Sequence, residues 1–315
     1  MMNSDTYFSL LLQALKNGDV KRKTLISGPH VGSEALYSGF RLLAGDCREE
    51  SGEILEEMLQ TDVELVVCGG GHIALELVAF ASRLGYRVTV IDEREQYCNP
   101  KRFPSASCLC LPFEQALEAE HGWIRPYFVI ATRGHSFDQL CLEKILSLNH
   151  RYVGMIGSKA KVATTLGNLK ARGFSQAQLD SVHTPIGLSI NAVTAGEIAV
   201  SILAQIIQTA RTGASVVHLD RNLLVHLANT TQKFCLVRVI AKRGSAPCDV
   251  GFQLAVFEDG TVEGTVGGGA VEAKAIEDAG TISSNTVIEY DLSNSKASEL
   301  GMICGGSVRL LFQLW

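Results

Sequence analysis

The chain has 315 residues, of which 46% are hydrophobic and 19% are charged, and its formal net charge is −5 at pH 7. A chain of this length usually exceeds a single hydrophobic core, so we expect two domains. The negative balance, with no basic stripe to neutralise phosphates, argues against nucleic acid as the main partner. The apolar stretches, such as residues 198–207, are too short to cross a bilayer, so we expect no membrane partner.

A cytoplasmic location is expected. The first residues contain no basic segment leading into an apolar one, as a secretory signal would. Nine cysteines stand at irregular spacings without a Cys-x-x-Cys pair, and this pattern indicates reduced thiols.

Residues 1–60 are expected to form a small α/β segment that packs with the C-terminal domain. Their apolar spacing predicts a helix over residues 7–16 and a strand over residues 23–28. The polar-faced pattern of residues 50–60 predicts a second helix.

Residues 61–215 alternate apolar runs with helical patterns. Strands are predicted at residues 63–68, 87–91, 107–110, 127–131 and 152–156, and helices at residues 72–84, 113–120, 137–148, 159–172 and 194–210. This alternation predicts a doubly wound parallel sheet.

The pattern of predicted helices and strands changes after a predicted linker at residues 211–220. A short helix is expected at residues 222–228, a second helix at 271–279, and strands at 234–241, 252–257, 261–264 and 308–314. Residues 220–315 are therefore expected to form a smaller C-terminal α/β domain.

Residues 63–94 carry the most informative pattern: a strand, a glycine-rich turn, a helix, and a second strand that ends on an acid. This is the order of a Rossmann-like dinucleotide-binding unit. The residues expected to bind a cofactor here are Gly69, Gly70, Gly71, His72, Asp92 and Arg94. Gly69 suits the tight turn, Gly71 the approach of a pyrophosphate, and Asp92 the ribose hydroxyls, which favours NAD over NADP.

Two further loops follow strands of the same predicted sheet and should face the same crevice. Their candidate residues are Arg133, His135, Gly157, Ser158 and Lys159. His135 could act as a proton donor, or it could simply begin a helix. Lys159 could bind an anion, or it could be a solvated residue of a first helical turn.

A third cluster lies in the C-terminal domain. Gly267, Gly268 and Gly269 precede a helix that carries Glu272, and such glycine runs form amide nests for anions. Cys304 is followed by two glycines that leave its sulfur little to cover it. Its thiolate could bind a transition metal or carry sulfur, or it could be a structural cysteine beside a glycine bulge.

Taken together, these segments resemble the XdhC/CoxI family, the maturation factors of xanthine dehydrogenase and related molybdenum hydroxylases. The matching motifs are GGHI at 70–73, VIDER at 90–94, NPKRFP at 99–104, TRGH at 132–135, YVGMIGS at 152–158, PIGL at 185–188, EIAVSI at 197–202, GSAP at 244–247, GTVGGGAVE at 264–272 and MICGG at 302–306. The familiar family order has the small domain first, so this chain resembles a circular permutation. Two departures are Cys248, where the family usually has arginine, and Ser189, where an acid is common.

The resemblance implies a factor that transiently binds the molybdenum cofactor (molybdopterin), assists its sulfuration and inserts it into an apo-molybdenum hydroxylase, with a cysteine desulfurase as a second partner. It makes Cys304 the candidate ligand or sulfur contact and assigns the cofactor phosphate to Gly267–Gly269. The candidate catalytic residues are therefore Cys304 and, as a proton donor, His135. The Rossmann crevice could hold the nucleotide part of the cofactor or a separate NAD(P). A homodimer is a reasonable expectation. The alternatives are an NAD(P)-dependent oxidoreductase and a nucleotide-sensing regulator.

Overall fold

The computed structural model describes residues 4–47, 52–212, 216–244, 248–291 and 306–315. The chain divides into two compact units. Unit 1 combines residues 1–62 with residues 213–315, and unit 2 is the continuous segment 63–212. The two ends of the chain therefore build one unit.

Unit 2 is built on a six-stranded sheet whose strands are all parallel. Its strands, in spatial order, are β10 (Val182–His183), β9 (Tyr152–Met155), β8 (Tyr127–Ile130), β5 (Glu64–Cys68), β6 (Arg87–Ile91) and β7 (Ser107–Leu109). The chain starts in the middle at β5, builds outward to β7, and then returns to β8 on the other side. This is the strand order of a Rossmann fold, and it creates a switch point between β5 and β8.

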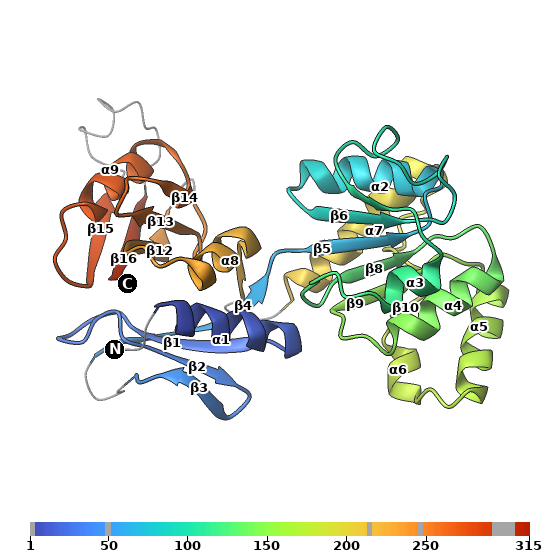
Figure 1. Ribbon diagram of the computed structural model, residues 1–315, viewed down its shortest axis with the longest axis horizontal. Helices are drawn as coiled ribbons and strands as arrows, with labels where there is room; N and C mark the ends of the chain where they lie inside the picture. The colour runs from blue at the N-terminus through green and yellow to red at the C-terminus, as the bar shows by residue number, and fades with distance from the viewer. Residues whose placement is uncertain (1–3, 48–51, 213–215, 245–247, 292–305) are drawn as a thin grey trace. The chain divides into compact units, whose positions relative to one another are not determined.

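Helices cover both faces of this sheet (Figure 1). One face packs against α2 (His72–Arg83) and α7 (Ala195–Ala210), and the other against α3 (Phe113–Glu118), α4 (His135–Ile145) and α5 (Lys159–Ala171). A short helix, α6 (Gln176–Asp180), follows α5. Strand β5 shows why both faces are covered, since Leu65 and Val67 enter one apolar cluster while Val66 and Cys68 enter the other. The predicted doubly wound sheet is confirmed.

Unit 1 contains two five-stranded sheets. The first has the order β11 (Val216–Leu219), β4 (Ile54–Thr61), β1 (Val20–Leu25), β2 (Glu34–Ser38) and β3 (Arg41–Gly45). The second has the order β14 (Val262–Gly264), β13 (Gln253–Phe257), β12 (Phe234–Arg243), β16 (Ser307–Leu314) and β15 (Thr286–Asp291). The helices of this unit are α1 (Ser4–Asn17), α8 (Arg221–Asn229) and α9 (Gly269–Ala279).

The prediction of a helix over residues 50–60 was wrong, because residues 54–61 form strand β4. This strand pairs antiparallel with β1 and parallel with β11, so it lies inside the sheet. Its alternation is hard to see in the sequence because an inward position is held by the buried acid Glu57. Pairing with two distant strands outweighs the local helical pattern. Part of the predicted linker is also a strand, β11.

A buried ionic network explains the inward position of Glu57. Arg22 Nε and Arg238 Nη1 lie 2.9 and 3.0 Å from Glu57 Oε2, and Arg238 also pairs with Glu34. The hydroxyl of Thr24 donates to Glu34 at 2.9 Å, and Tyr7 donates to the same carboxylate. Burial favours a raised pKa for Glu34, but the neighbouring Arg238 and Arg22 outweigh it and hold the pKa below its ordinary value. The network ties β1, β2 and β4 to β12 within unit 1.

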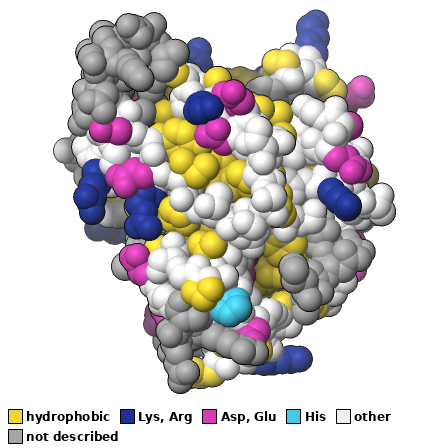
Figure 2. All heavy atoms as spheres, turned by 90° about the vertical axis from the view of Figure 1, so that its left-hand side faces the viewer, with side chains coloured by type: hydrophobic (Ala, Val, Ile, Leu, Met, Phe, Trp, Pro, Cys, Tyr) yellow, Lys and Arg dark blue, Asp and Glu magenta, His cyan; other side chains and the backbone are white. Residues whose placement is uncertain are grey.

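Charges on the surface of unit 1 are arranged differently. Among the described side chains on the face in Figure 2, basic and acidic groups are interspersed with apolar ones. Exposed ion pairs of this unit, such as Lys21 with Glu56, contribute little to stability.

Candidate functional site

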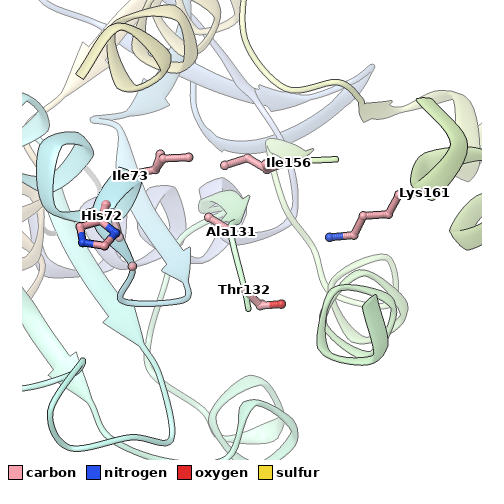
Figure 3. Close-up of a pocket in the computed structure, with 8 residues that line it drawn as sticks. His72, Ile73, Ala131, Thr132, Ile156 and Lys161 are labelled. Carbon is pink, nitrogen blue, oxygen red and sulfur yellow. The ribbon is translucent and has the colours of Figure 1, made fainter. Parts of the chain in front are cut away.

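A pocket opens in unit 2 at the carboxyl ends of neighbouring strands. Its volume is about 210 Å³, and Figure 3 shows His72 on one side of it and Lys161 on the opposite side. The pocket lies at the switch point between β5 and β8, where open α/β sheets bind their ligands. Its lining residues are Gly71, His72, Ile73, Ala74, Ala131, Thr132, Ile156 and Lys161.

The three glycines of the turn after β5 have different tasks. Gly69 has φ 111°, and a Cβ there would lie 2.3 Å from the carbonyl oxygen of Ala131. A Cβ on Gly70 would lie 1.9 Å from the carbonyl oxygen of Tyr97. A Cβ on Gly71 would meet no protein atom within 4 Å. The chain itself thus requires Gly69 and Gly70, whereas Gly71 leaves open space at the pocket and at the start of α2.

Lys161 contributes an ammonium group to the described wall of this pocket, and it is not among the residues predicted from the sequence. Its ammonium pairs with Asp138, a carboxylate that is 1% exposed, and Thr132 Oγ1 donates to the other oxygen of Asp138 at 2.6 Å. These contacts hold the lysine at the pocket. Helix dipoles favour anions at a helix start, so the start of α2 and the ammonium favour the same kind of ligand.

The predicted lysine, Lys159, is exposed and does not line the pocket. It stands at the first position of α5, which Ser158 caps by accepting from the amide of Lys161 at 3.4 Å. Positions 159 and 161 differ by about 200° around a helix, so only one of the two can face the pocket. The helix-start signal at Ser158 predicts where α5 begins, but it does not show which of the two lysines faces the pocket.

Asp92 lies directly beneath the glycine turn. Its two oxygens accept four hydrogen bonds: from the amide of Gly70 at 3.0 Å, and from the amide, Nε and Nη2 of Arg94 at 3.1, 2.8 and 2.7 Å. Burial favours a raised pKa for Asp92, but the hydrogen bonds from Arg94 and Gly70 outweigh it, and the pKa lies below its ordinary value. Asp92 is therefore ionised, and its oxygens already accept hydrogen bonds from the chain itself.

The remaining predicted residues of unit 2 lie around the pocket but not in its wall. Arg133 is exposed and pairs with Glu93 at 2.6 Å. His135 is exposed and begins α4. Gly157 and Ser158 connect β9 to α5. Of the predicted residues, the structure places Gly71 and His72 in the pocket wall.

The glycine run of unit 1 is a segment of positive φ, with values of 116°, 73° and 65° at Gly267, Gly268 and Gly269. Its amide nest holds an internal anion. Glu272 accepts from the amides of Val266 and Gly268 at 2.9 and 3.2 Å, and from the hydroxyl of Thr265 at 2.5 Å. Burial favours a raised pKa for Glu272, and these hydrogen bonds outweigh it and lower the pKa. A phosphate bound here would have to displace Glu272.

Cys304, the predicted metal or sulfur contact, lies outside the described residues. The eight cysteines within the described ranges are free thiols, and burial raises the pKa of Cys98 to about 12. In those same ranges no group of three His, Cys, Asp or Glu side chains could hold a metal ion. Nor does any helix described there have the length and apolarity to cross a membrane.

Comparison with known families matches both parts of the chain. Residues 65–206 match the XdhC Rossmann domain, and residues 227–291 match the XdhC and CoxI family. The chain belongs to the XdhC/CoxI family. Its Rossmann half precedes its XdhC/CoxI half, which is the permuted order noted in the sequence.

Two curated proteins are similar to this chain. The uncharacterized protein YqeB of Escherichia coli (strain K12) is 33% identical over 148 residues, which are 46% of this chain and 27% of that protein. A probable xanthine dehydrogenase subunit of Bacillus subtilis (strain 168) is 29% identical over 169 residues, 53% of this chain and 49% of that protein. The chain thus spans half or less of the length of these curated relatives.

Among similar solved structures is that of a xanthine dehydrogenase from Bacillus halodurans. It is 26% identical to this chain, with a TM-score of 0.50, and the match covers 64% of each chain. The likeness therefore extends from sequence to fold.

Proposed function

We propose that this chain is an accessory factor that binds the molybdenum cofactor, assists its sulfuration and inserts it into a xanthine dehydrogenase-type molybdenum hydroxylase. The observation that carries the proposal is the presence of both family halves in one chain. The names of the Bacillus subtilis and Bacillus halodurans relatives support xanthine dehydrogenase as the enzyme served.

The pocket of unit 2 fits the phosphate end of the cofactor. Molybdopterin ends in a phosphate, and the pocket offers the start of α2, the open side of Gly71 and the ammonium of Lys161. The nest at residues 267–269 is a weaker choice because Glu272 already accepts from the amide of Gly268 within it and from the neighbouring amide of Val266. We therefore assign the phosphate to the pocket of unit 2.

Cys304 is the proposed sulfur contact. A thiolate binds soft metals and carries sulfur, and the sulfur would come from a cysteine desulfurase partner. The bound cofactor supplies the molybdenum centre that the hydroxylase later uses. This chain's own task is to hold the cofactor, keep water from it and release it to the apo-hydroxylase, with a homodimer as the proposed assembly.

The proposal is tested by purifying the full chain from cells that make molybdenum cofactor. After denaturation, we expect a stoichiometric amount of the fluorescent oxidised pterin together with molybdenum. Cys304→Ala should lower the molybdenum or sulfur content, while Cys110→Ala, a matched change at an exposed cysteine, should not. An absence of pterin from the wild-type protein would contradict the proposal.

An NAD(P)-dependent oxidoreductase is the second candidate, and the complete strand, turn and helix of the Rossmann unit favour it. The hydrogen bonding of Asp92 weighs against an oxidoreductase, because Arg94 and Gly70 already occupy the acceptor positions of this carboxylate. Hydride exchange from NADH to an acceptor by pterin-free protein would favour this alternative.

A further inference from the structure

A Rossmann site recognises an adenine dinucleotide through two contacts. The start of the first helix binds the pyrophosphate, and the acid at the end of the second strand accepts hydrogen bonds from the ribose hydroxyls. In this chain the two contacts fall on α2 and on Asp92. The start of α2 is open to a ligand, so Asp92 decides whether a dinucleotide fits.

Asp92 has no acceptor position left for a ribose. An ionised carboxylate offers about four lone-pair sites, and Asp92 already accepts four hydrogen bonds from Arg94 and Gly70. The residue is 1% exposed. A ribose would have to break the bonds with Arg94 and then reach a carboxylate that the chain covers.

The loop after β6 adds a steric barrier. The carbonyl oxygen of Tyr97 lies so close to Gly70 that a Cβ there would be 1.9 Å away. The guanidinium of Arg94 lies 3.9 Å from the centre of the Tyr97 ring, and Arg102 Nε donates to the carbonyl of Gly70 at 3.1 Å. The segment from Asp92 to Arg102 is thus packed onto the turn where the ribose of a dinucleotide would lie.

The space that remains open for a ligand in unit 2 is small. The pocket volume of about 210 Å³ lies below the roughly 300–1,000 Å³ of most ligand sites. Lys161 and the start of α2 make its wall suited to an anion.

We infer that the loop after β6 closes the ribose subsite, so that this protein takes a phosphorylated ligand by its phosphate end and does not bind NAD(P) in the Rossmann pose. Asp92 is then a positioning residue that fixes the glycine turn and Arg94, and it does not touch the ligand. The inference rests on the proposed function only in taking the pocket of unit 2 as the ligand site.

The test is calorimetry of the full, ligand-free chain with pyrophosphate, ADP and NADH. A ribose bonded to a carboxylate would raise affinity by about tenfold or more over pyrophosphate. We expect ADP and NADH to bind within about threefold of pyrophosphate, because the nucleoside adds no contact. Lys161→Ala should weaken all three together, and Lys159→Ala should weaken none.

A matched pair of variants identifies the role of Asp92. Asp92→Asn and Glu93→Gln each remove one negative charge from the same loop, and we expect neither to change the ratio of NADH to pyrophosphate affinity. An NADH advantage of about tenfold that Asp92→Asn abolishes and Glu93→Gln retains would overturn the inference. So would a failure of all three probes to bind. Each result is independent of pterin retention, which tests the proposed function separately.

Discussion

Glu57 is the residue on which the buried network of unit 1 depends, since it is 3% exposed and accepts from both Arg22 and Arg238. Glu57→Gln would leave two buried guanidinium groups with too little negative charge. We expect a loss of about 3–5 kcal/mol in the free energy of unfolding of unit 1. Urea unfolding followed by the fluorescence of Trp315, with Trp123→Phe as the background, measures it.

The control for this prediction is the neighbouring residue Glu56. It pairs with Lys21 and Lys23 at 2.6 and 3.2 Å, and its side chain is 46% exposed. Glu56→Gln should change the free energy of unfolding by no more than about 1 kcal/mol. Equal effects at the two positions would show that the network does not stabilise unit 1.

Asp92 makes the stability of unit 2 depend on pH. Its pKa is lowered in the folded state, so its contribution is present above the unfolded value of about 3.9 and is lost as the pH falls through the folded pKa. Asp92→Asn should cost about 2 kcal/mol at pH 7. In acid-titrated urea unfolding followed by Trp123, this cost should shrink below about pH 4. A cost that stays constant into acid would contradict the ionised, hydrogen-bonded state.

At the scale of elements, the turn between β5 and α2 separates glycines that serve the fold from one that serves the ligand. Gly69→Ala and Gly70→Ala should destabilise unit 2, because their Cβ atoms would meet carbonyl oxygens at 2.3 and 1.9 Å. Gly71→Ala should leave the melting temperature nearly unchanged, because its Cβ meets only open space. It should instead weaken pyrophosphate binding. A Gly71→Ala protein that melts at a much lower temperature but still binds pyrophosphate normally would contradict these separate roles.

Five strands of the unit 2 sheet could be predicted from the sequence because they are local apolar runs separated by helices. Strand β10 could not, because it is only two residues long and is defined by its pairing with β9. Strand β4 could not, because its inward acid is explained only by Arg22 and Arg238, which lie far away in the chain. Strand β11 was missed for a similar reason, since its pairing partner is β4.

The same limit applies to the pocket. The glycine turn is a local pattern, so Gly71 and His72 could be predicted from it. Lys161 could not be chosen over Lys159 without knowing that Asp138, on another helix, faces it. Asp92 has no free acceptor position because the side chain of Arg94 turns back toward it. The order of residues in the sequence does not show this side-chain direction.

At the scale of the whole molecule, the two units differ in how the chain builds them. Unit 2 is continuous, whereas unit 1 needs residues from both ends of the chain. We expect the fragment 63–212 to fold alone, since it contains its complete sheet and both apolar clusters. The fragment 1–62 should stay unfolded, because β4 would lose β11 and Glu57 would lose Arg238. Circular dichroism and amide exchange of the two fragments check this expectation.

We propose that this chain delivers molybdenum cofactor to a hydroxylase. The direct measurement is to incubate the full chain, purified from cofactor-producing cells, with a xanthine dehydrogenase-type apo-hydroxylase and to follow hydroxylation activity. We predict that activity appears in proportion to the pterin supplied by the chain, and that Lys161→Ala protein supplies less than Lys159→Ala protein. Pterin-loaded chain that restores no activity, or restoration equally well by chain without pterin, would contradict the account.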